Sequence, residues 1–410
     1  MGTNGSAMRR ILITGATGFT GRHACRLFAA TGWEVIGVSS GRSGGTGEPR
    51  GAAPQKTWGS GEALRKSNAG GEALRESGVC GEVHWKSGVC EEDQWKPGVS
   101  REDQWKSGVS EGTGEPRGEW REYVPPIVGC DLTEKQAVFE LCRELQPDAV
   151  LHLAGQNAVD RSWQRPDETL AVNVWSTVHL LEGMRASGRG ERGRILVVGS
   201  MLTNASLETA AHPYGFSKAV QVAAALNWHN WYGIEALAVE PSNLIGPGGS
   251  QGLCGKLARW VAAVEAARPG RDGQENPEGE REASRPSPMG DPIGSNPFVL
   301  SSLAEERDYL DVRDAVSAYE ALLLRGQAGR LYSLGSGVMR TLGEVKEAFD
   351  AAAKVKLAWQ IRDQGGPSPQ PRDLSDILSL GWRPLIPFTQ SIEDALEDER
   401  HRLGESNRKG

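Results

Sequence analysis

The chain has 410 residues, with 38% hydrophobic and 24% charged content, 53 glycines and a formal net charge of −7. This size allows two modest domains, and the glycine content indicates that part of the chain is unpacked. The acidic balance argues against nucleic acid or a membrane as partner, and no apolar run is long enough to span a bilayer. Six cysteines without a C-x-x-C pair predict neither disulfides nor a metal site. We expect a cytoplasmic protein.

The first predicted elements are an apolar strand over residues 10–14 and a helix over about 18–30, joined by the turn Thr14-Gly-Ala-Thr-Gly-Phe-Thr-Gly21. In such a turn the first glycine permits a tight bend, the second close approach of a pyrophosphate, and the third close packing of helix on strand. The helix start offers free N–H groups to the phosphates. The expected dinucleotide contacts are Gly15, Thr17, Gly18, Phe19 and Gly21.

A second strand is predicted over residues 33–38, and Ser39-Ser40-Gly41-Arg42 follows it. An acidic residue at this point would bind the adenosine 2′-hydroxyl of NAD, whereas an arginine suits the 2′-phosphate of NADP. Arg42 therefore favours NADP (NADPH) over NAD as the cofactor. Arg42 could equally be the first solvated residue of a linker.

From about Gly61 the chain repeats every ten residues, with Trp85, Trp95 and Trp105 in one phase. One or two apolar residues per copy cannot offset the entropy of ordering the rest, so we interpret residues 42–120 as a flexible insert. A tryptophan-bearing ligand for a partner, or a lid over the adenosine end, is the alternative. Residues 268–297, rich in Gly, Pro, Glu and Arg, are expected to be a second flexible insert.

Outside these inserts the chain alternates strands with helices. Further strands are predicted over residues 123–130, 149–154, 194–199 and 234–240, with a helix over 135–145 and one long helix carrying Asn173. Ligands of open α/β sheets bind at the carboxyl ends of the strands. Candidate residues follow three of these strand ends: Asp131 and Leu132, then Leu153, Ala154, Gly155 and Gln156, then Ser200.

Tyr214 and Lys218 lie four residues apart at the start of the next helix, so their side chains share one face. A phenol there can move a proton while a bound dinucleotide moves a hydride. The free phenol has a pKa of about 10, and a nearby lysine cation favours its ionised form. The pair predicts a nicotinamide oxidoreductase, the alternative being a tyrosine that merely packs.

These motifs occur in the order typical of the extended short-chain dehydrogenases/reductases, the NAD-dependent epimerase/dehydratase family, which the chain resembles outside the inserts. Segments after the fourth strand, after Pro241 and around Arg307 are most similar to the branch of GDP-mannose 4,6-dehydratase and GDP-4-dehydro-6-deoxy-D-mannose reductase. The resemblance implies a doubly wound parallel α/β sheet (Rossmann). It places a dinucleotide-binding domain at 1–240, returning at about 300–335, and a smaller C-terminal substrate-binding region at 241–298 and 338–405.

The resemblance also implies the roles of the site residues. Ser200, Tyr214 and Lys218 would be catalytic, and Lys218 would also bind the nicotinamide ribose. The substrate would contact Gln156, Ser200, Asn243 and Arg307, with Arg307 as a pyrophosphate clamp. An ion pair of Arg307 with Asp308 or Asp311 is the alternative.

One position distinguishes dehydratase from reductase in this family. Dehydratases carry a glutamate two residues after the catalytic Ser/Thr, because elimination needs a second acid/base. Leu202 occupies that position and cannot transfer a proton. We therefore expect NAD(P)H-dependent reduction of a nucleotide-linked 4-keto-6-deoxy sugar, unless Glu208 or another carboxylate replaces the glutamate. A dehydratase, an NAD-dependent epimerase and a catalytically silent NADP-binding sensor or scaffold remain alternatives.

Two features of the family bear on the substrate pocket and on assembly. Glu240 stands where an arginine usually precedes the proline, so the pocket is expected to be altered. Relatives dimerise through the helices that carry Asn173 and Tyr214, and we expect a homodimer. Apolar residues available for that surface are Val172, Val174, Val178, Leu180, Leu181, Val220, Ala223, Ala224 and Leu226.

Overall fold

The computed structural model describes residues 9–40, 57–58, 125–189, 193–202, 209–267, 297–366 and 368–409. All of them belong to one compact unit of the chain. Arg42 and most of the two predicted inserts lie outside the described residues, and Glu208 does as well. The roles predicted for Arg42, Glu208 and the two inserts therefore stay predictions.

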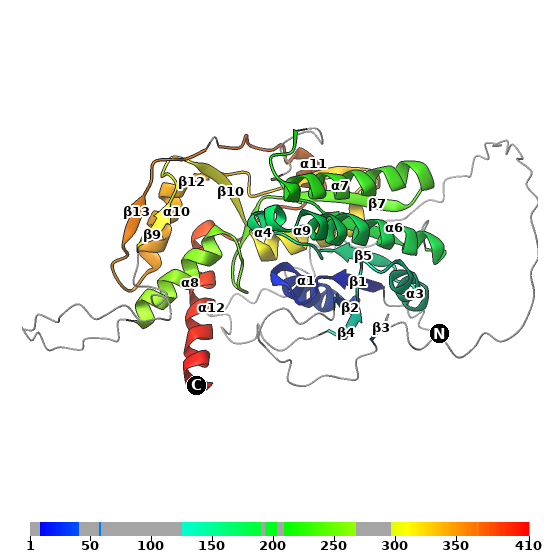
Figure 1. Cartoon of the computed structure of the whole chain (residues 1–410), viewed down its shortest axis with the longest axis horizontal. Coiled ribbons are helices and arrows are strands. Elements are labelled where there is room, and N and C mark those ends of the chain that lie inside the picture. Colours follow the sequence, from blue (N-terminus) through cyan, green and yellow to red (C-terminus); the bar gives the residue numbers. More distant parts are fainter. Residues whose placement is uncertain are drawn as a thin grey trace, which may run out of the picture. The chain divides into compact units, whose positions relative to one another are not determined.

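A parallel sheet forms the centre of this unit (Figure 1). Its eight described strands run in the order β11-β7-β6-β5-β1-β2-β4-β3, and every neighbouring pair is parallel. The strands are β1 (Arg10–Thr14), β2 (Glu34–Ser39), β3 (Thr57–Trp58), β4 (Ile127–Cys130), β5 (Ala149–His152), β6 (Arg194–Val198), β7 (Glu235–Pro241) and β11 (Leu331–Leu334). Continuous apolar runs such as Ile11-Leu12-Ile13 are buried because helices cover both faces.

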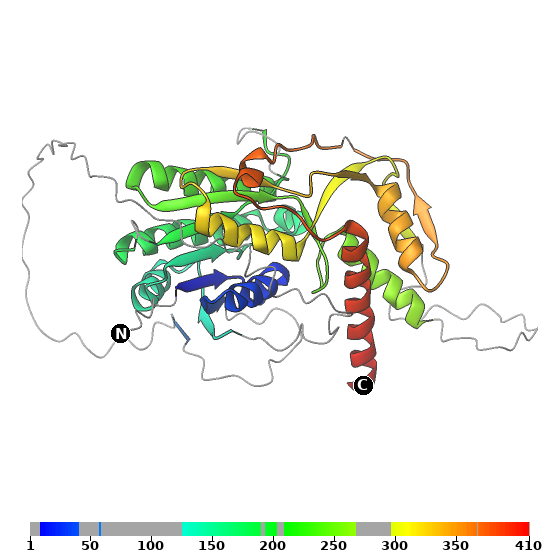
Figure 2. The same cartoon turned by 180° about the vertical axis from the view of Figure 1, so that it is seen from behind.

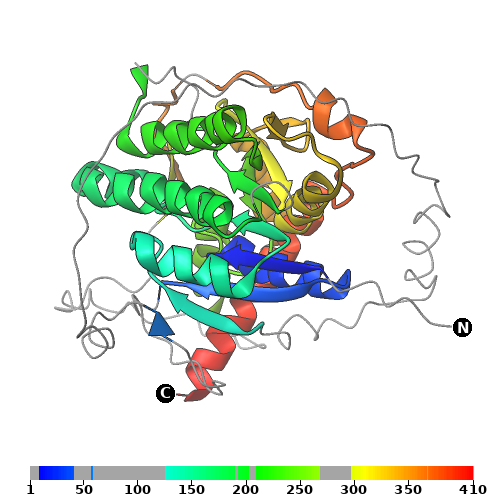
Figure 3. The same ribbon diagram turned by 90° about the vertical axis from the view of Figure 1, so that its right-hand side faces the viewer.

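Helices α1 (Phe19–Ala30) and α9 (Val312–Arg325) pack together on one face, seen from behind in Figure 2. On the other face lie α3 (Lys135–Leu145), α6 (Ser176–Ala186) and α7 (Pro213–Tyr232). Figure 3 shows these three helices, in teal and green, on the left of the sheet. A hydrophobic cluster fills each interface. The predicted doubly wound parallel sheet is confirmed.

The long helix predicted to carry Asn173 is confirmed as a continuous helical stretch from Pro166 to Ala186, with Asn173 in a π-helical segment at its middle and a separate short helix before it. The stretch comprises α5 (Pro166–Leu170), the π-helical segment η2 (Ala171–Trp175) and α6, and the separate short helix is α4 (Val159–Gln164). Pro166 disfavours helical dihedrals at the preceding residue, and Arg165 has φ −136° and ψ 67°. The strand predicted over 123–130 is shorter, since it begins at Ile127 among the described residues.

A second group of elements, seen in Figure 1 around α8 and α12, follows the carboxyl end of β7. It contains β8 (Asn243–Ile245), β10 (Glu306–Asp311) and β12 (Met339–Thr341) in one sheet, and β9 (Phe298–Leu300) with β13 (Trp359–Ile361) in another. Helices α8 (Leu253–Ala266), α10 (Leu342–Ala352) and α12 (Phe388–Lys409) enclose a third hydrophobic cluster. The short helix α11 (Ser375–Ser379) contacts β11.

Three of the residues suggested for a dimer surface cannot serve there. Leu180 and Leu181 of α6 and Ala224 of α7 are 1%, 0% and 8% exposed. They lie on the sides of these helices that pack against the sheet, in its hydrophobic cluster. The helical periodicity of the apolar residues did not by itself show which side of α6 and α7 faces the sheet and which faces outward. Within the described ranges, no helix is long and apolar enough to cross a membrane.

Candidate active site

The glycine turn after β1 has the close packing that a dinucleotide site needs. Gly15 has φ +67°, and a Cβ at this position would lie 2.9 Å from the Ala154 backbone nitrogen. A Cβ at Gly21 would lie 2.1 Å from the Gly15 carbonyl oxygen, so α1 packs directly on the turn. Gly18 is the N-cap of α1 and provides no side-chain cap. The first N–H groups of α1 thus suit a pyrophosphate.

The hydroxyl of Thr14 ties the glycine turn to the loop after β5. Its Oγ1 accepts hydrogen bonds from the backbone nitrogens of Leu153 and Ala154, at 3.1 and 3.0 Å. The same hydroxyl then donates to His152 Nδ1 at 2.8 Å, which leaves the imidazole hydrogen on Nε2, 3.0 Å from Thr177 Oγ1. Burial lowers the pKa of His152 to about 3, consistent with this neutral tautomer. Sequence reasoning missed this role of His152.

Asn173 connects the same loop to α7. Its Oδ1 accepts from the Gln156 backbone nitrogen at 2.7 Å, and its Nδ2 donates to the Gln156 carbonyl at 3.1 Å and to Ser217 Oγ at 2.8 Å. A Cβ at Gly155 would lie 3.0 Å from Asn173 Oδ1 and 3.4 Å from Lys218 Nζ. The glycine therefore lets the loop approach the predicted catalytic lysine. The Gln156 side chain bonds to Ala158 and Thr169 instead.

Ser200, Tyr214 and Lys218 come together at the carboxyl end of β6. The Tyr214 side chain is 5% exposed and hydrogen-bonds to the Ser200 side chain. Lys218 is 3% exposed, and its Nζ donates to the Val198 carbonyl and to Gln221 Oε1, both at 3.0 Å. These three predicted catalytic residues thus form one cluster around the strand end.

Burial sets the protonation behaviour of the cluster. It raises the pKa of Tyr214, and the hydrogen bond from Ser200 opposes that shift. Burial lowers the pKa of Lys218 to about 8. The phenol therefore starts in its neutral form, which can donate a proton.

His212 begins the helix that carries Tyr214. Its Nδ1 accepts a hydrogen bond from the Gly215 backbone nitrogen at 2.8 Å, which makes the histidine the N-cap of α7. Its ring stacks on Tyr214, with 5.8 Å between the ring centroids. Sequence reasoning missed this residue, although its place before Pro213 at a helix start was an available signal.

Two of the predicted substrate contacts, Arg307 and Asn243, already have partners within the protein. Arg307 forms an ion pair with Glu305, not with Asp308 or Asp311, and it also donates to the Glu306 carbonyl. Asn243 is exposed, and its Nδ2 donates to the Asp308 carbonyl at 3.0 Å. A pyrophosphate bound by Arg307 would have to compete with the Glu305 carboxylate.

Asp131, one of the candidate residues after a strand end, directly follows β4. Its Oδ1 accepts from the backbone nitrogen and the hydroxyl of Thr133, at 3.0 and 2.7 Å. This turn leads into α3, with Leu132 largely buried beside it. The carboxylate thus stabilises the turn between β4 and α3, and a cofactor contact through it stays a prediction.

The loop after β8 returns to the glycine turn. Arg22 donates to the Thr17 carbonyl at 2.7 Å and to the Gly248 carbonyl at 2.5 Å. The neighbouring His23 Nε2 lies 2.8 Å from the Pro247 carbonyl oxygen. The ring of Phe19 lies edge-on to that of His23, with centroids 5.8 Å apart. The C-terminal elements therefore contact the start of α1 directly.

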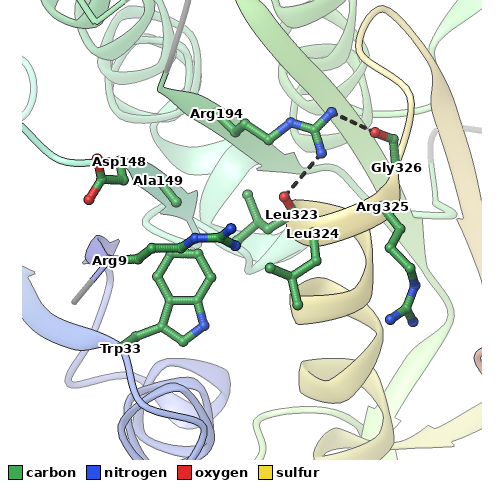
Figure 4. A pocket seen from close by; sticks show the side chains of 9 residues that line it. All are labelled: Arg9, Trp33, Asp148, Ala149, Arg194, Leu323, Leu324, Arg325 and Gly326. Carbon is green, nitrogen blue, oxygen red and sulfur yellow. Dashed lines mark hydrogen bonds between the residues drawn. The ribbon is translucent and has the colours of Figure 1, made fainter. Parts of the chain in front are cut away.

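A cavity of about 420 Å³ lies elsewhere, near the amino ends of the strands (Figure 4). Arg194 spans it and donates to the carbonyls of Leu323 and Gly326 at the end of α9. Arg9 lies over the Trp33 ring, with its Cζ 5.9 Å from the centroid. No predicted site residue lines this cavity, so it is separate from the candidate active site.

The chain belongs to the NAD dependent epimerase/dehydratase family, which matches residues 11–68 and 102–335. It is 30% identical to GDP-6-deoxy-D-mannose reductase of Pseudomonas aeruginosa over 299 residues, covering 67% of this chain and 87% of that protein. It is 26% identical to dTDP-glucose 4,6-dehydratase of Xanthomonas campestris over 66% of this chain and 78% of that protein.

Two solved structures share the fold. "RMD" of Pseudomonas aeruginosa complexed with NADPH aligns with a TM-score of 0.62 at 21% identity, covering 96% of this chain and 100% of that one. UDP-glucose 4-epimerase of Thermus thermophilus with NAD gives 0.62 at 19% identity, covering 95% and 99%. The expected class is confirmed: an NAD(P)-dependent oxidoreductase of the extended short-chain dehydrogenase/reductase type that acts on a nucleotide sugar.

Proposed function

We propose that this chain reduces a nucleotide-linked 4-keto-6-deoxy sugar, with GDP-4-dehydro-6-deoxy-D-mannose as the expected substrate and NADPH as the expected reductant. The main observation is the buried Ser200–Tyr214 hydrogen bond beside Lys218, combined with Leu202 two residues after the serine. The reductase of Pseudomonas aeruginosa supports this choice by its 30% identity.

The catalytic residues would act on one carbonyl group. The bound nicotinamide would supply the hydride that the sugar C4 receives. Tyr214 donates its phenolic proton to the C4 oxygen, so one hydride and one proton convert the carbonyl to an alcohol. Ser200 orients that oxygen through its hydroxyl. The Lys218 cation stabilises the phenolate that remains, and burial strengthens this interaction.

Leu202 argues against the dehydratase reaction. Its side chain is 47% exposed, and its backbone nitrogen donates to Ser200 Oγ at 3.2 Å. The residue thus adjoins the serine but offers no proton. A dehydratase stays the second candidate because Glu240, at the end of β7, is a 6% exposed carboxylate beside Gly199. Glutamate at that position is unusual for the family that the chain resembles.

The preference for NADPH is part of the proposal. Arg42 suits a 2′-phosphate, and the similar structure from Pseudomonas aeruginosa is complexed with NADPH. The described glycine turn fits the diphosphate of NADPH and NADH alike. Direct comparison of the two dissociation constants would test the preference.

We also propose a homodimer that forms through the outer side of α7 and the segments beside it. Exposed aromatic residues are found there: Trp163, Trp175, Trp231 and Tyr232 are 61%, 56%, 61% and 51% exposed. Exposed aromatic groups of this size favour burial in an interface. The surface replaces the one expected from Leu180 and Leu181.

The test is cofactor oxidation, followed at the nicotinamide absorbance band with NADPH or NADH and GDP-4-keto-6-deoxymannose. Tyr214→Phe should reduce kcat at least about 100-fold and leave the NADPH dissociation constant within about twofold, because only the proton donor is removed. Tyr232→Phe, at an exposed position of the same helix, is the matched control and should retain activity.

Other outcomes would identify the alternatives. Formation of a 4-keto product from GDP-mannose would show a dehydratase, and interconversion of C4 epimers without net oxidation would show an epimerase. Tight NADPH binding with no turnover of these sugars would favour a sensor or scaffold. Undiminished activity in Tyr214→Phe would refute the assigned proton donor.

A further inference from the structure

Gln221 lies one helical turn after Lys218 on α7 and is completely buried. Its Oε1 accepts a hydrogen bond from Lys218 Nζ at 3.0 Å. The Val198 carbonyl, at the end of β6, accepts a second at 3.0 Å. An ammonium group has three hydrogens, so these two bonds leave one N–H of Lys218 for another partner. The Gly155 loop lies beside this group, since a Cβ built on Gly155 would be 3.4 Å from Lys218 Nζ.

The orientation of the Gln221 amide is imposed by the lysine. An ammonium group only donates, so the amide must present its oxygen. Its Nε2 is then buried with no hydrogen-bond partner in the described structure. Leaving a buried donor unpaired is unfavourable. The structure therefore keeps the hydrogen bond from Lys218 to Gln221 Oε1 although Gln221 Nε2 is left unpaired.

Gln221 is also a neutral partner for a buried cation. Burial lowers the pKa of Lys218 to about 8, and a carboxylate in place of the amide would oppose that shift. Titratable groups on the surrounding elements are Tyr214 on α7, His152 on β5 and Glu240 on β7, the last lying beside Gly199, the residue after Val198. Of these, His152 is held neutral, and its pKa is lowered partly by the Lys218 charge.

We propose that Gln221 is a positioning residue: its amide oxygen, held against Lys218 Nζ, aims the remaining N–H of the lysine at the cofactor ribose, and its neutrality leaves burial to determine the alkaline limit of cofactor binding. The inference rests on the proposed role of Lys218. With a neutral partner, Lys218 loses its charge within the pH range in which enzymes are ordinarily assayed. Above that limit the charge that supports Tyr214 would also be lost.

The experiment measures NADPH affinity by fluorescence titration from pH 6.5 to 10 in the full-length protein, without sugar. Wild-type affinity should fall above about pH 8. Gln221→Glu should move this limit upward by at least about one pH unit, since an adjacent carboxylate stabilises the ammonium group. Gln221→Met should move it downward and weaken binding about tenfold at pH 8, because one hydrogen bond that aims the lysine is lost.

Gln327→Glu introduces the same charge at an exposed site and should leave the profile unchanged. Lys218→Met separates the proposed role of Lys218 from that of Gln221. If it binds NADPH as the wild type does at every pH, the proposed role of Lys218 fails. If it binds weakly but Gln221→Glu keeps the wild-type limit, the role of Gln221 is overturned. Should Gln221→Met fail to fold, as judged by circular dichroism, the wild type and Gln221→Glu alone decide the outcome.

Discussion

At the scale of single residues, Thr14 shows how one hydroxyl stabilises the cofactor turn. It is completely buried and joins three partners on the β5 end. Thr14→Val should lower the free energy of unfolding by roughly 3 kcal/mol, because two partly buried N–H groups lose their acceptor and the buried His152 Nδ1 loses its donor. Urea unfolding measures the change. Thr14→Ser keeps the hydroxyl and should lose much less; equal losses in both variants would mean that the methyl packing dominates.

Lys218 predicts a pH dependence of stability at the same scale. Its pKa is lowered from 10.5 to about 8 in the folded protein. Between these values the unfolded chain binds more protons, so stability rises with pH there. Relative to Lys218→Met, the wild type should gain roughly 2 to 3 kcal/mol between pH 7.5 and 10.5. Urea unfolding at several pH values measures this gain, and a constant difference between the two proteins would contradict the burial of a charged lysine.

At the scale of elements, the π-helical segment η2 connects the β5 loop to α7 through Asn173. Asn173→Ala removes three hydrogen bonds and should lower the free energy of unfolding by roughly 2 to 3 kcal/mol. Hydrogen exchange at the Gln156 amide should accelerate more than exchange in α3. The control Asn227→Ala removes one amide bond within α7, to the Ala223 carbonyl. A uniform acceleration of exchange in Asn173→Ala would argue against a local connection.

At the scale of the whole molecule, the exposed aromatic residues predict the oligomeric state. Trp231→Arg should convert a dimer to a monomer at micromolar concentration, because it places a charge in an apolar interface. Light scattering coupled to size exclusion measures the mass. Leu385→Arg, at a 64% exposed leucine in the C-terminal region, is the matched control and should remain dimeric. A wild-type monomer would refute the proposed homodimer.

Local patterns predicted much of the fold. The apolar run at residues 10–14, the glycine turn and the helix over 135–145 have the predicted bounds or nearly so, since strand burial and helix period are local properties. Pro166, the first residue of the helix that carries Asn173, is a local signal for where that helix starts. The π-helical geometry at Asn173 depends on contacts with the β5 loop and α7, which no local pattern contains.

The spacing of Tyr214 and Lys218, the glycine turn and the order of strands and helices were determined by the sequence itself, because each follows from backbone geometry over a few residues. Only the tertiary structure decided the partners of these groups. Gln221 and Val198 bind Lys218, and Glu305 rather than an aspartate pairs with Arg307. Such partners depend on which side chains packing brings within hydrogen-bond distance after the sheet and its covering helices have assembled, and short-range sequence patterns do not contain that information.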